Sequence, residues 1–420
     1  MQVIDSGFAA SLARVLPGWL RRQTWLSRSA ATLLGVEVLD TETIVRDPAI
    51  GWVDVRAMFG GGVAERYRLI VAVRTEVPSD IDPDAVIGEV EVDGRTLVVF
   101  EAMAWRAGAL SAIRALMPHV VDTAVAPDAL TVLPWGGISP TVLIDVRWEI
   151  KAHRQVSDLP NPDVELPAAM ARAEVGRVAP IAEQVTRNGQ VALALRSSLR
   201  IRQDGLDLVA ASLRQLFEAR VPPRLARNDV ADEMEQIGRG VAEMHVALAT
   251  TFESEPADGG AWAELLLAPL HRLGSGRIRF DRLEGVLQRL QGAEDLGRSI
   301  RTHGNLHLGN VAQTMQGWIP HNFEGDGRPY SELRQNVSPL RDLGRLVVSL
   351  GRAARTMTEH YLEDDFERDR ELDVLADSWE ERVVSHLVGG YTSVDEVLRL
   401  LPAGREARDA LLRVFGLEHQ

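Results

Sequence analysis

The residues from Arg301 to Asp342 constrain this chain more than any other stretch of its sequence. His303–Asn310 reads HGNLHLGN, a polar loop rich in small and hydrogen-bonding residues. A short strand is predicted over Gly317–Asn322, and a second polar segment, NFEG, begins at its last residue. The pattern therefore predicts two polar loops on either side of a short β-hairpin.

Kinase-type enzymes use this layout to hold a catalytic base and a metal–nucleotide complex. The segments HGNLHLGN, NFEG and SPLRD resemble the maltokinase family, including its glucosamine-kinase relatives. That family belongs to the aminoglycoside-phosphotransferase branch of protein-kinase-like folds, and its usual sequence motifs are HGDLHxGQ and DFEGEP. The resemblance implies an α+β, bilobal protein-kinase-like fold with an N-terminal cystatin-like cap and a mostly helical C-lobe.

Two residues that differ from the family motifs affect the predicted catalysis directly. Asn305 stands where the family has its catalytic Asp, and a side-chain amide is not basic near neutral pH. Asn322 stands where the family has its metal-binding Asp, and it offers a neutral oxygen to a cation that prefers carboxylates. Asn310 fits the second metal position, and Glu324 could share the side of Asn322 if the strand continues.

Composition and charge narrow the classes of partner. The chain has 420 residues, a formal net charge of −14 and no cysteine. Nucleic acid and anionic membranes are therefore disfavoured as partners, and disulfides and thiolate metal sites are excluded. The N-terminus lacks a signal-peptide pattern and no apolar run is long enough to span a membrane, so the chain is predicted to be cytoplasmic.

Lys151 is the one lysine in the chain. It lies near the end of a β-hairpin predicted over Ser139–Val156, and the segment Asn161–Glu165 (NPDVE) follows at the start of a helix. A strand Lys and a helix Glu form the pair with which kinases hold nucleotide phosphates, so we predict that Lys151 pairs with Glu165. The alternative is a surface Lys and an ordinary helix-start Glu. Asp163 is predicted to be the N-cap of that helix.

A glycine-containing turn precedes this hairpin. The segment GGIS ends at Ser139, where a phosphate-covering turn would lie in the family, and we assign Ser139 and Thr141 to nucleotide binding with Lys151. Such turns are also common in ordinary loops, so the signal has low specificity.

Further roles follow from the family segments around the second loop. Glu324, Arg328 and Arg341 are candidate sugar contacts. Arg341 and Asp342 are also predicted to form a structural ion pair that braces the first loop. His303 and His307, candidate catalytic-loop residues beside Asn305, are predicted to brace the same loop through backbone hydrogen bonds.

The chain divides into three predicted parts: a cap over residues 1–102, an N-lobe over 103–220 and a helical C-lobe over 221–420. Trp19 and Trp25 are predicted to be core residues. His245 adjoins an apolar stripe of spacing four and three, and we interpret it as a buried histidine with satisfied hydrogen bonds. Further helices are predicted over 280–290, 342–361 and 372–387.

Two functions remain open at this point. The first is a pseudokinase, or a very weak sugar kinase, that binds ATP, a sugar or a protein partner such as an enzyme of trehalose, maltose or glycogen metabolism. The second is an active ATP- and Mg²⁺-dependent kinase of maltose or an amino sugar, which would recruit Glu324 or Asp326 for its metal. The paired Asn305 and Asn322 favour the first, and Lys151 with Glu165 favours the second.

Overall fold

The computed structural model describes residues 4–26, 32–122, 124–134, 137–173, 175, 178, 180–262, 295–325, 327–362 and 370–417. The chain forms two compact units. The first comprises Met1–Glu165, Ala179–Ser198 and Asp326–Tyr330, and the second comprises Leu166–Val178, Leu199–Gly325 and Ser331–Gln420.

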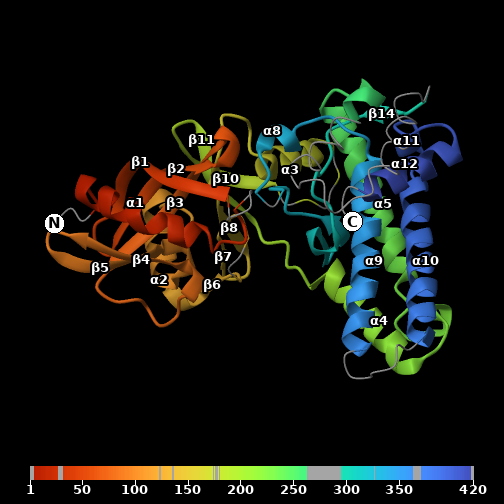
Figure 1. Cartoon of the computed structure of the whole chain (residues 1–420), viewed down its shortest axis with the longest axis horizontal. Helices are drawn as coiled ribbons and strands as arrows, with labels where there is room; N and C mark the ends of the chain where they lie inside the picture. Colours follow the sequence, from red (N-terminus) through yellow and green to blue (C-terminus); the bar gives the residue numbers. More distant parts are fainter. Residues whose placement is uncertain are drawn as a thin grey trace. The chain divides into compact units, whose positions relative to one another are not determined.

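The first unit begins with a helix and a mainly antiparallel sheet (Figure 1). Its strands run in the order β1-β2-β3-β5-β4, and a short strand, β9, also pairs with β3. The elements are α1 (Ser6–Leu20), β1 (Leu33–Val45), β2 (Ala49–Phe59), β3 (Ala64–Arg74), β4 (Val86–Val92), β5 (Arg95–Glu101) and β9 (Gln155–Val156).

Local sequence explains these elements. Asp5 caps α1, because its side chain accepts a hydrogen bond from the backbone N–H of Phe8 at 2.9 Å. Phe8, Leu12 and Leu16, four residues apart, face one side of the helix and are fully buried against the sheet. The β4–β5 turn contains Asp93-Gly94, and both residues have positive φ, as a tight hairpin turn requires.

A second antiparallel sheet completes the first unit, with the strand order β10-β11-β8-β7-β6. A core shared with the first sheet and α2 buries residues such as Trp52, Phe100 and Ile150. The elements are α2 (Arg106–Leu116), β6 (Leu130–Val132), β7 (Thr141–Ile144), β8 (Trp148–Ala152), β10 (Ile181–Arg187) and β11 (Gln190–Ser197). The residues of α3 (Pro162–Arg172) divide between the two units.

The second unit is mainly helical, and α5, α9 and α10 run side by side in it (Figure 1). Its helices are α4 (Gly205–Ala219), α5 (Ala231–Thr251), α8 (Tyr330–Leu333), α9 (Leu340–Leu362), α10 (Arg370–Thr392), α11 (Asp395–Leu398) and α12 (Arg405–Leu417). Its strands are β12 (Gln203–Asp204), β13 (Glu255–Pro256), β14 (Arg298–Ser299), β15 (Val311–Thr314) and β16 (Gly317–Pro320).

Two glycines let α5 and α10 approach closely. A Cβ added to Gly238 on α5 would clash with the carbonyl oxygen of Leu387, and one on Gly390 of α10 would clash with that of Glu235. Backbone lies directly opposite in both cases, so neither position has room for a larger residue. This packing fixes α5, which carries His245, against α10, which carries Tyr391.

Most elements predicted from the sequence are present. The polar loop and the short hairpin are confirmed as β15 and β16 with the loop before them, and Trp19 and Trp25 are buried as predicted. The helix predicted over 280–290 lies outside the described residues. No helix in the described part of the chain is long and apolar enough to cross a bilayer. Short 3-10 helices lie at Gly60–Gly62, Pro83–Ala85, Ala102–Ala104, Pro127–Ala129, Pro223–Leu225 and Leu308–Asn310.

Candidate functional site

Lys151 lies on β8, the central strand of the second sheet of the first unit. It is aligned with Thr141 on β7 and with Ala194 on β11. Its side chain is buried, and its Nζ lies 3.0 Å from an oxygen of Asp163 in the first turn of α3. The structure therefore places a buried strand lysine against a helix carboxylate.

Asp163 is held as an anion by more than one cation. Arg196 on β11 lies 3.5 Å from the same carboxylate oxygen, and it also donates to Glu149 on β8. Burial by itself would raise the pKa of Asp163, but Lys151 and Arg196 outweigh it and hold the pKa well below the usual range. The carboxylate is therefore charged at any physiological pH.

The role of Asp163 in this helix differs from the sequence prediction. The backbone N–H of Asp163 donates to the side chain of Asn161 at 2.9 Å, so Asn161 provides the cap that the sequence assigned to Asp163. Asp163 also places a carboxylate beside Lys151, and Glu165 is half-buried in the same turn, so the pairing of Lys151 with Glu165 stays a prediction. No pattern in the sequence singled out Arg196, which directly faces Glu149 in the sheet.

The turn before β7 is closed by its own side chains. The hydroxyl of Thr141 donates to the backbone oxygen of Ser139 at 3.2 Å. Ser139 is buried, and the turn leads directly into the strand that pairs with Lys151. Ser139 thus ends the turn and Thr141 begins β7, and the phosphate-binding role of both stays a prediction.

In the second unit, Asp342 braces the polar loop. Its carboxylate accepts hydrogen bonds from the backbone N–H groups of His303 at 2.7 Å and Gly304 at 3.0 Å. Gly304 has a φ of 77°, a conformation that favours glycine. The guanidinium of Arg345 also donates to the backbone oxygen of Gly304. The loop is therefore held by charged groups of α9 through its main chain.

Asp342 is itself part of a buried chain of hydrogen bonds. Its carboxylate lies 3.2 Å from Nε2 of His245, whose Nδ1 lies 2.8 Å from the hydroxyl of Tyr391. Burial raises the pKa of Asp342, but its contacts with His245, and the charges of His303 and Arg345, lower it to about 2. The interpretation of His245 as a satisfied core histidine is confirmed. The partnership with Tyr391 was missed, because nothing local in the sequence connects residues 146 apart.

His303 has a defined hydrogen-bonding state. Its Nε2 lies 2.9 Å from the backbone oxygen of His321 and therefore carries a proton. Its Nδ1 accepts from the backbone N–H of Asn305 at 3.3 Å. Burial lowers the pKa of His303, although Asp342 raises it in part, so the ring is neutral at neutral pH. Its ring packs on Phe323 at 4.5 Å between centroids.

Three asparagines in this unit form one connected set. Nδ2 of Asn310 donates to the backbone oxygen of Asn305 at 2.9 Å and lies 3.0 Å from Nε2 of His307. Nδ2 of Asn322 donates to Oδ1 of Asn310 at 3.0 Å. Because the oxygen of Asn305 can only accept, the amide of Asn310 must present its own oxygen to Asn322. The orientation of both amides therefore follows from the network.

This arrangement does not fit a magnesium ion. Mg²⁺ requires oxygen ligands at about 2.0–2.1 Å in near-octahedral geometry, usually with a carboxylate. Here the two positions assigned to the metal are joined amide to amide, and the oxygen of Asn310 already accepts a hydrogen bond. Glu324 is buried in the turn that follows Asn322, and Asp326 lies outside the described residues.

The predicted sugar contacts divide between the units. Arg341 is buried at the start of α9, next to Asp342. The carboxylate of Asp342 lies 3.2 Å from Nε2 of His245. Glu324 belongs to the second unit, as Arg341 does. Arg328 belongs to the first unit, where its backbone oxygen accepts a hydrogen bond from the side chain of Gln155 at 3.2 Å.

Comparison with known proteins identifies the first sheet and the fold. Residues 19–104 match the family model of the maltokinase N-terminal cap domain. Over these residues the chain is similar to maltokinases. This maltokinase-like chain also shares its fold with "Glucosamine kinase in complex with glucosamine, ADP and inorganic phosphate", with a TM-score of 0.54 and 14% identity over 98% of this chain and 92% of that chain.

A second solved structure, "Glucosamine kinase (crystal form A)", gives a TM-score of 0.54 and 14% identity over 96% of this chain and 95% of that chain. The predicted α+β kinase-like fold, with an N-terminal cap and a helical C-terminal part, is confirmed. In the first unit, the second sheet carries the buried lysine on its central strand, and α3 follows that strand in the chain.

Proposed function

We propose that this maltokinase-like protein is a pseudokinase: a kinase fold that binds a nucleotide and a sugar but does not transfer phosphate efficiently. The observation that supports this proposal most directly is the hydrogen bond from Asn322 to Asn310. The protein itself supplies a donor at the point where a kinase places a divalent cation between two oxygen ligands. A cation would have to displace that donor and would find no anionic oxygen on either side chain.

The second argument concerns the proton of the acceptor hydroxyl. Phosphoryl transfer to a sugar needs a group that accepts or orients this proton, and the amide of Asn305 has no basic lone pair. General-base catalysis contributes roughly 10²–10⁴-fold to rates. Loss of this group alone leaves a slow enzyme, and loss of the metal position with it removes the main electrostatic stabilisation of the transferred phosphoryl group.

Other features favour retained binding. The buried pair of Lys151 and Asp163 has the form of a phosphate clamp, and Asp342 still holds the backbone of the loop before Asn305. Burying these charges costs free energy, so a chain without any ligand would gain from replacing them with apolar residues. The glucosamine kinase of the same fold was solved with ADP and glucosamine, which makes both the first ligands to test.

The test compares the wild-type protein with the variant Asn305→Asp/Asn322→Asp. We expect wild type to bind ADP in calorimetry with little dependence on Mg²⁺, and to phosphorylate glucosamine or maltose at least about 100-fold more slowly than the double variant. Asn322→Asp alone should give an intermediate rate, because it restores the metal position without a general base, and Asn305→Asp alone should stay closer to wild type. Asn188→Asp is the matched control, since Asn188 is an exposed turn residue whose φ of 51° is close to the 61° of Asn322.

Three outcomes would contradict the proposal in different ways. Rapid, Mg²⁺-dependent turnover by wild type would establish the alternative, an active sugar kinase that obtains its metal ligand from Glu324 or Asp326. Absence of ADP binding at millimolar concentration would exclude the nucleotide part of the proposal and leave sugar or protein binding. An increase in turnover with Asn188→Asp would show that added charge, and not the two positions, causes the effect.

A further inference from the structure

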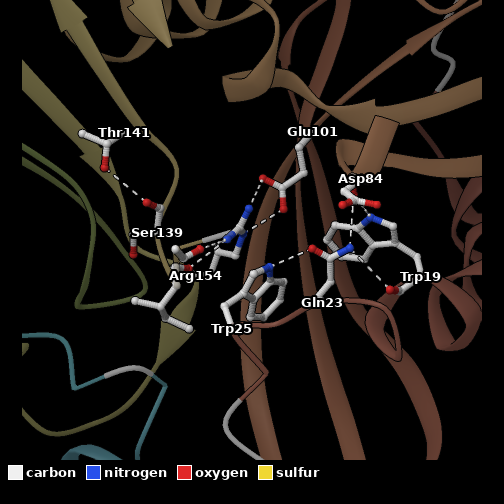
Figure 2. A network of polar contacts seen from close by, with 10 residues as sticks. Trp19, Gln23, Trp25, Asp84, Glu101, Ser139, Thr141 and Arg154 are labelled. Atoms are coloured by element: carbon white, nitrogen blue, oxygen red, sulfur yellow. Dashed lines mark hydrogen bonds and ion pairs between the residues drawn. The ribbon is translucent and has the colours of Figure 1, made fainter. Parts of the chain in front are cut away.

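Arg154 lies directly after β8 and is almost completely buried. Its Nε donates to Glu101 at 2.8 Å and its Nη2 donates to the other oxygen of the same carboxylate at 3.1 Å (Figure 2). Glu101 is the last residue of β5 in the maltokinase-type cap and is also buried. A forked, fully buried Arg–Glu pair thus joins the cap sheet to the end of the lysine strand.

The same guanidinium group also holds the turn that precedes β7. Its Nη1 donates to the backbone oxygens of Gly137 at 2.8 Å and Ile138 at 3.0 Å. All three nitrogens of Arg154 are therefore engaged, two with the cap and one with this turn. Since Arg is planar and rigid, such contacts fix the direction of the carbonyl groups as well as their distance.

The side chain of Ile138 strengthens the connection from the opposite direction. It is buried in the hydrophobic core that α1 forms with the cap sheet. The turn therefore has its main chain held by Arg154 and its one large apolar side chain held by the cap. Its polar residue, Ser139, is followed by the strand that pairs with Lys151.

Cap residues also fix the position of Arg154. Its guanidinium lies over the ring of Trp25, 4.5 Å from the centroid, and Nε1 of Trp25 donates to Gln23 at 3.0 Å. The amide of Gln23 and the indole of Trp19 both donate to the backbone oxygen of Asp84 (Figure 2). A continuous chain of contacts leads from the cap helix and the β4 side of the cap to the turn.

From this arrangement we infer that Arg154 is a positioning residue, through which the cap sets the geometry of the Gly137–Ser139 turn that would cover nucleotide phosphates. The identity of the ligand rests on the nucleotide binding proposed above. The coupling between the cap and the turn does not depend on it. Coupling between two sites is reciprocal, so a nucleotide that orders the turn should also protect the cap.

Stability alone accounts poorly for this pair. Burial raises the pKa of Glu101 even though Arg154 lies beside it, so the environment penalises the charged carboxylate. Replacing a buried ion pair by apolar residues is often neutral or stabilising for the fold. What apolar residues cannot reproduce is the pair of hydrogen bonds to the carbonyl groups of Gly137 and Ile138.

The experiment follows hydrogen exchange of the full-length protein, together with ADP affinity. In Arg154→Met we expect exchange of the peptide around residues 137–143 to rise at least about 10-fold, because two charge-assisted hydrogen bonds to the turn are lost. Exchange in β2 should stay as in wild type, and ADP affinity should fall at least about 10-fold. Glu101→Gln keeps an acceptor for Arg154 and should leave both quantities within about 3-fold of wild type.

Arg74→Met is the matched control, because Arg74 also lies over a tryptophan ring, that of Trp105 at 4.9 Å, but is exposed and belongs to β3. It should change neither quantity. If Arg154→Met does not fold, Glu101→Leu/Arg154→Met removes both buried charges together and should give the same loosening of the turn.

Unchanged exchange of the turn in both Arg154 variants would overturn the inference, whatever the nucleotide result. A rise spread evenly over the cap would also overturn it, because it would indicate a merely structural role. If wild type binds no ADP, the proposed nucleotide function fails, while the exchange data still decide the role of Arg154. ADP binding that protects the turn but leaves cap exchange unchanged would overturn the reciprocal coupling.

Discussion

The side-chain amide of Asn322 donates a hydrogen bond to the side-chain amide of Asn310 across 3.0 Å. Asn322 adopts a left-handed backbone conformation, with a φ of 61°, at the end of the short hairpin, and Asn310 ends the loop that precedes it. Both positions are predicted from the sequence to bind a metal. Their direct contact joins the end of the hairpin to the end of the loop.

The first prediction follows from replacing the donor in this contact. Asn322→Asp sets a carboxylate against the oxygen of Asn310, so two acceptors would face each other. Without a cation, we expect the free energy of unfolding to fall by about 1–3 kcal/mol. Millimolar Mg²⁺ should restore part of this loss, because the new oxygen pair can bind it. Urea unfolding with and without Mg²⁺ measures both effects.

Wild type and Asn188→Asp serve as controls for this experiment, and neither should respond to Mg²⁺. Asn188 shares the positive φ of Asn322 but lies in an exposed hairpin turn. Should Asn322→Asp unfold at the same urea concentration with and without Mg²⁺, the assignment of these two positions to the former metal site would be wrong.

The second prediction concerns the reactivity of Lys151. Its amine is buried 3.0 Å from Asp163, and a protonated amine does not attack an acylating reagent. We expect an N-hydroxysuccinimide ester to acetylate Lys151 at least about 10-fold more slowly in the native protein than in urea. Because the chain has no other lysine, peptide mass spectrometry reads this one site without overlap.

Two variants separate the possible partners of Lys151. Asp163→Asn removes the carboxylate that lies 3.0 Å from the amine and should increase the rate of acetylation. Glu165→Gln, two residues further along the same helix, should increase it less. A larger effect of Glu165→Gln would support the pairing of Lys151 with Glu165 that the sequence predicts.

The two acidic residues of α3 illustrate why this site was only partly predictable. The sequence correctly indicated a strand lysine followed by an acidic helix start, since both signals are local. Asp163 and Glu165 lie in the same helical turn but point in different directions, because successive helix residues rotate by about 100°. That Asp163 lies beside Lys151 depends on how α3 is rotated against the sheet, and no local pattern records that rotation.

In the second unit, too, features set by neighbouring residues were predictable and contacts between residues far apart in sequence were not. The polar loop, the hairpin and the buried state of His245 follow from short patterns of apolar and polar residues. The link from His245 to Tyr391, and the salt bridge of Arg196 with Glu149 in the first unit, connect residues 146 and 47 positions apart. They are set by the packing of α5 on α10 and by the register of β11 on β8, which only the folded chain defines.

The third prediction concerns the charge of Asp342. In Asp342→Asn the fold loses an anion that accepts from two loop amides and from His245, all in a fully buried position. We expect the free energy of unfolding to fall by about 3 kcal/mol in urea denaturation at neutral pH. Asp409→Asn, at a half-buried position on α12 where the carboxylate faces solvent in part, should change it by less than about 0.5 kcal/mol. Equal effects of the two variants would contradict the brace.

The last prediction is the pH dependence of this same contribution. The pKa of Asp342 is lowered to about 2 in the folded protein, from its ordinary value of 3.8. The unfolded chain therefore takes up a proton first as the pH falls, and the stabilisation is complete above about pH 4 and lost between about pH 4 and pH 2. At about 1.36 kcal/mol per pKa unit, the loss is about 2 kcal/mol.

The measurement is the difference in unfolding free energy between wild type and Asp342→Asn as a function of pH. This comparison is needed because His303, whose pKa is lowered by burial, also makes the wild type less stable as the pH falls below about 6.5. The difference should stay constant from about pH 7 to pH 5 and shrink towards about pH 2. A difference that shrinks already near pH 6 would assign the dependence to the histidines, and one that never shrinks would show that Asp342 stabilises the loop without its charge.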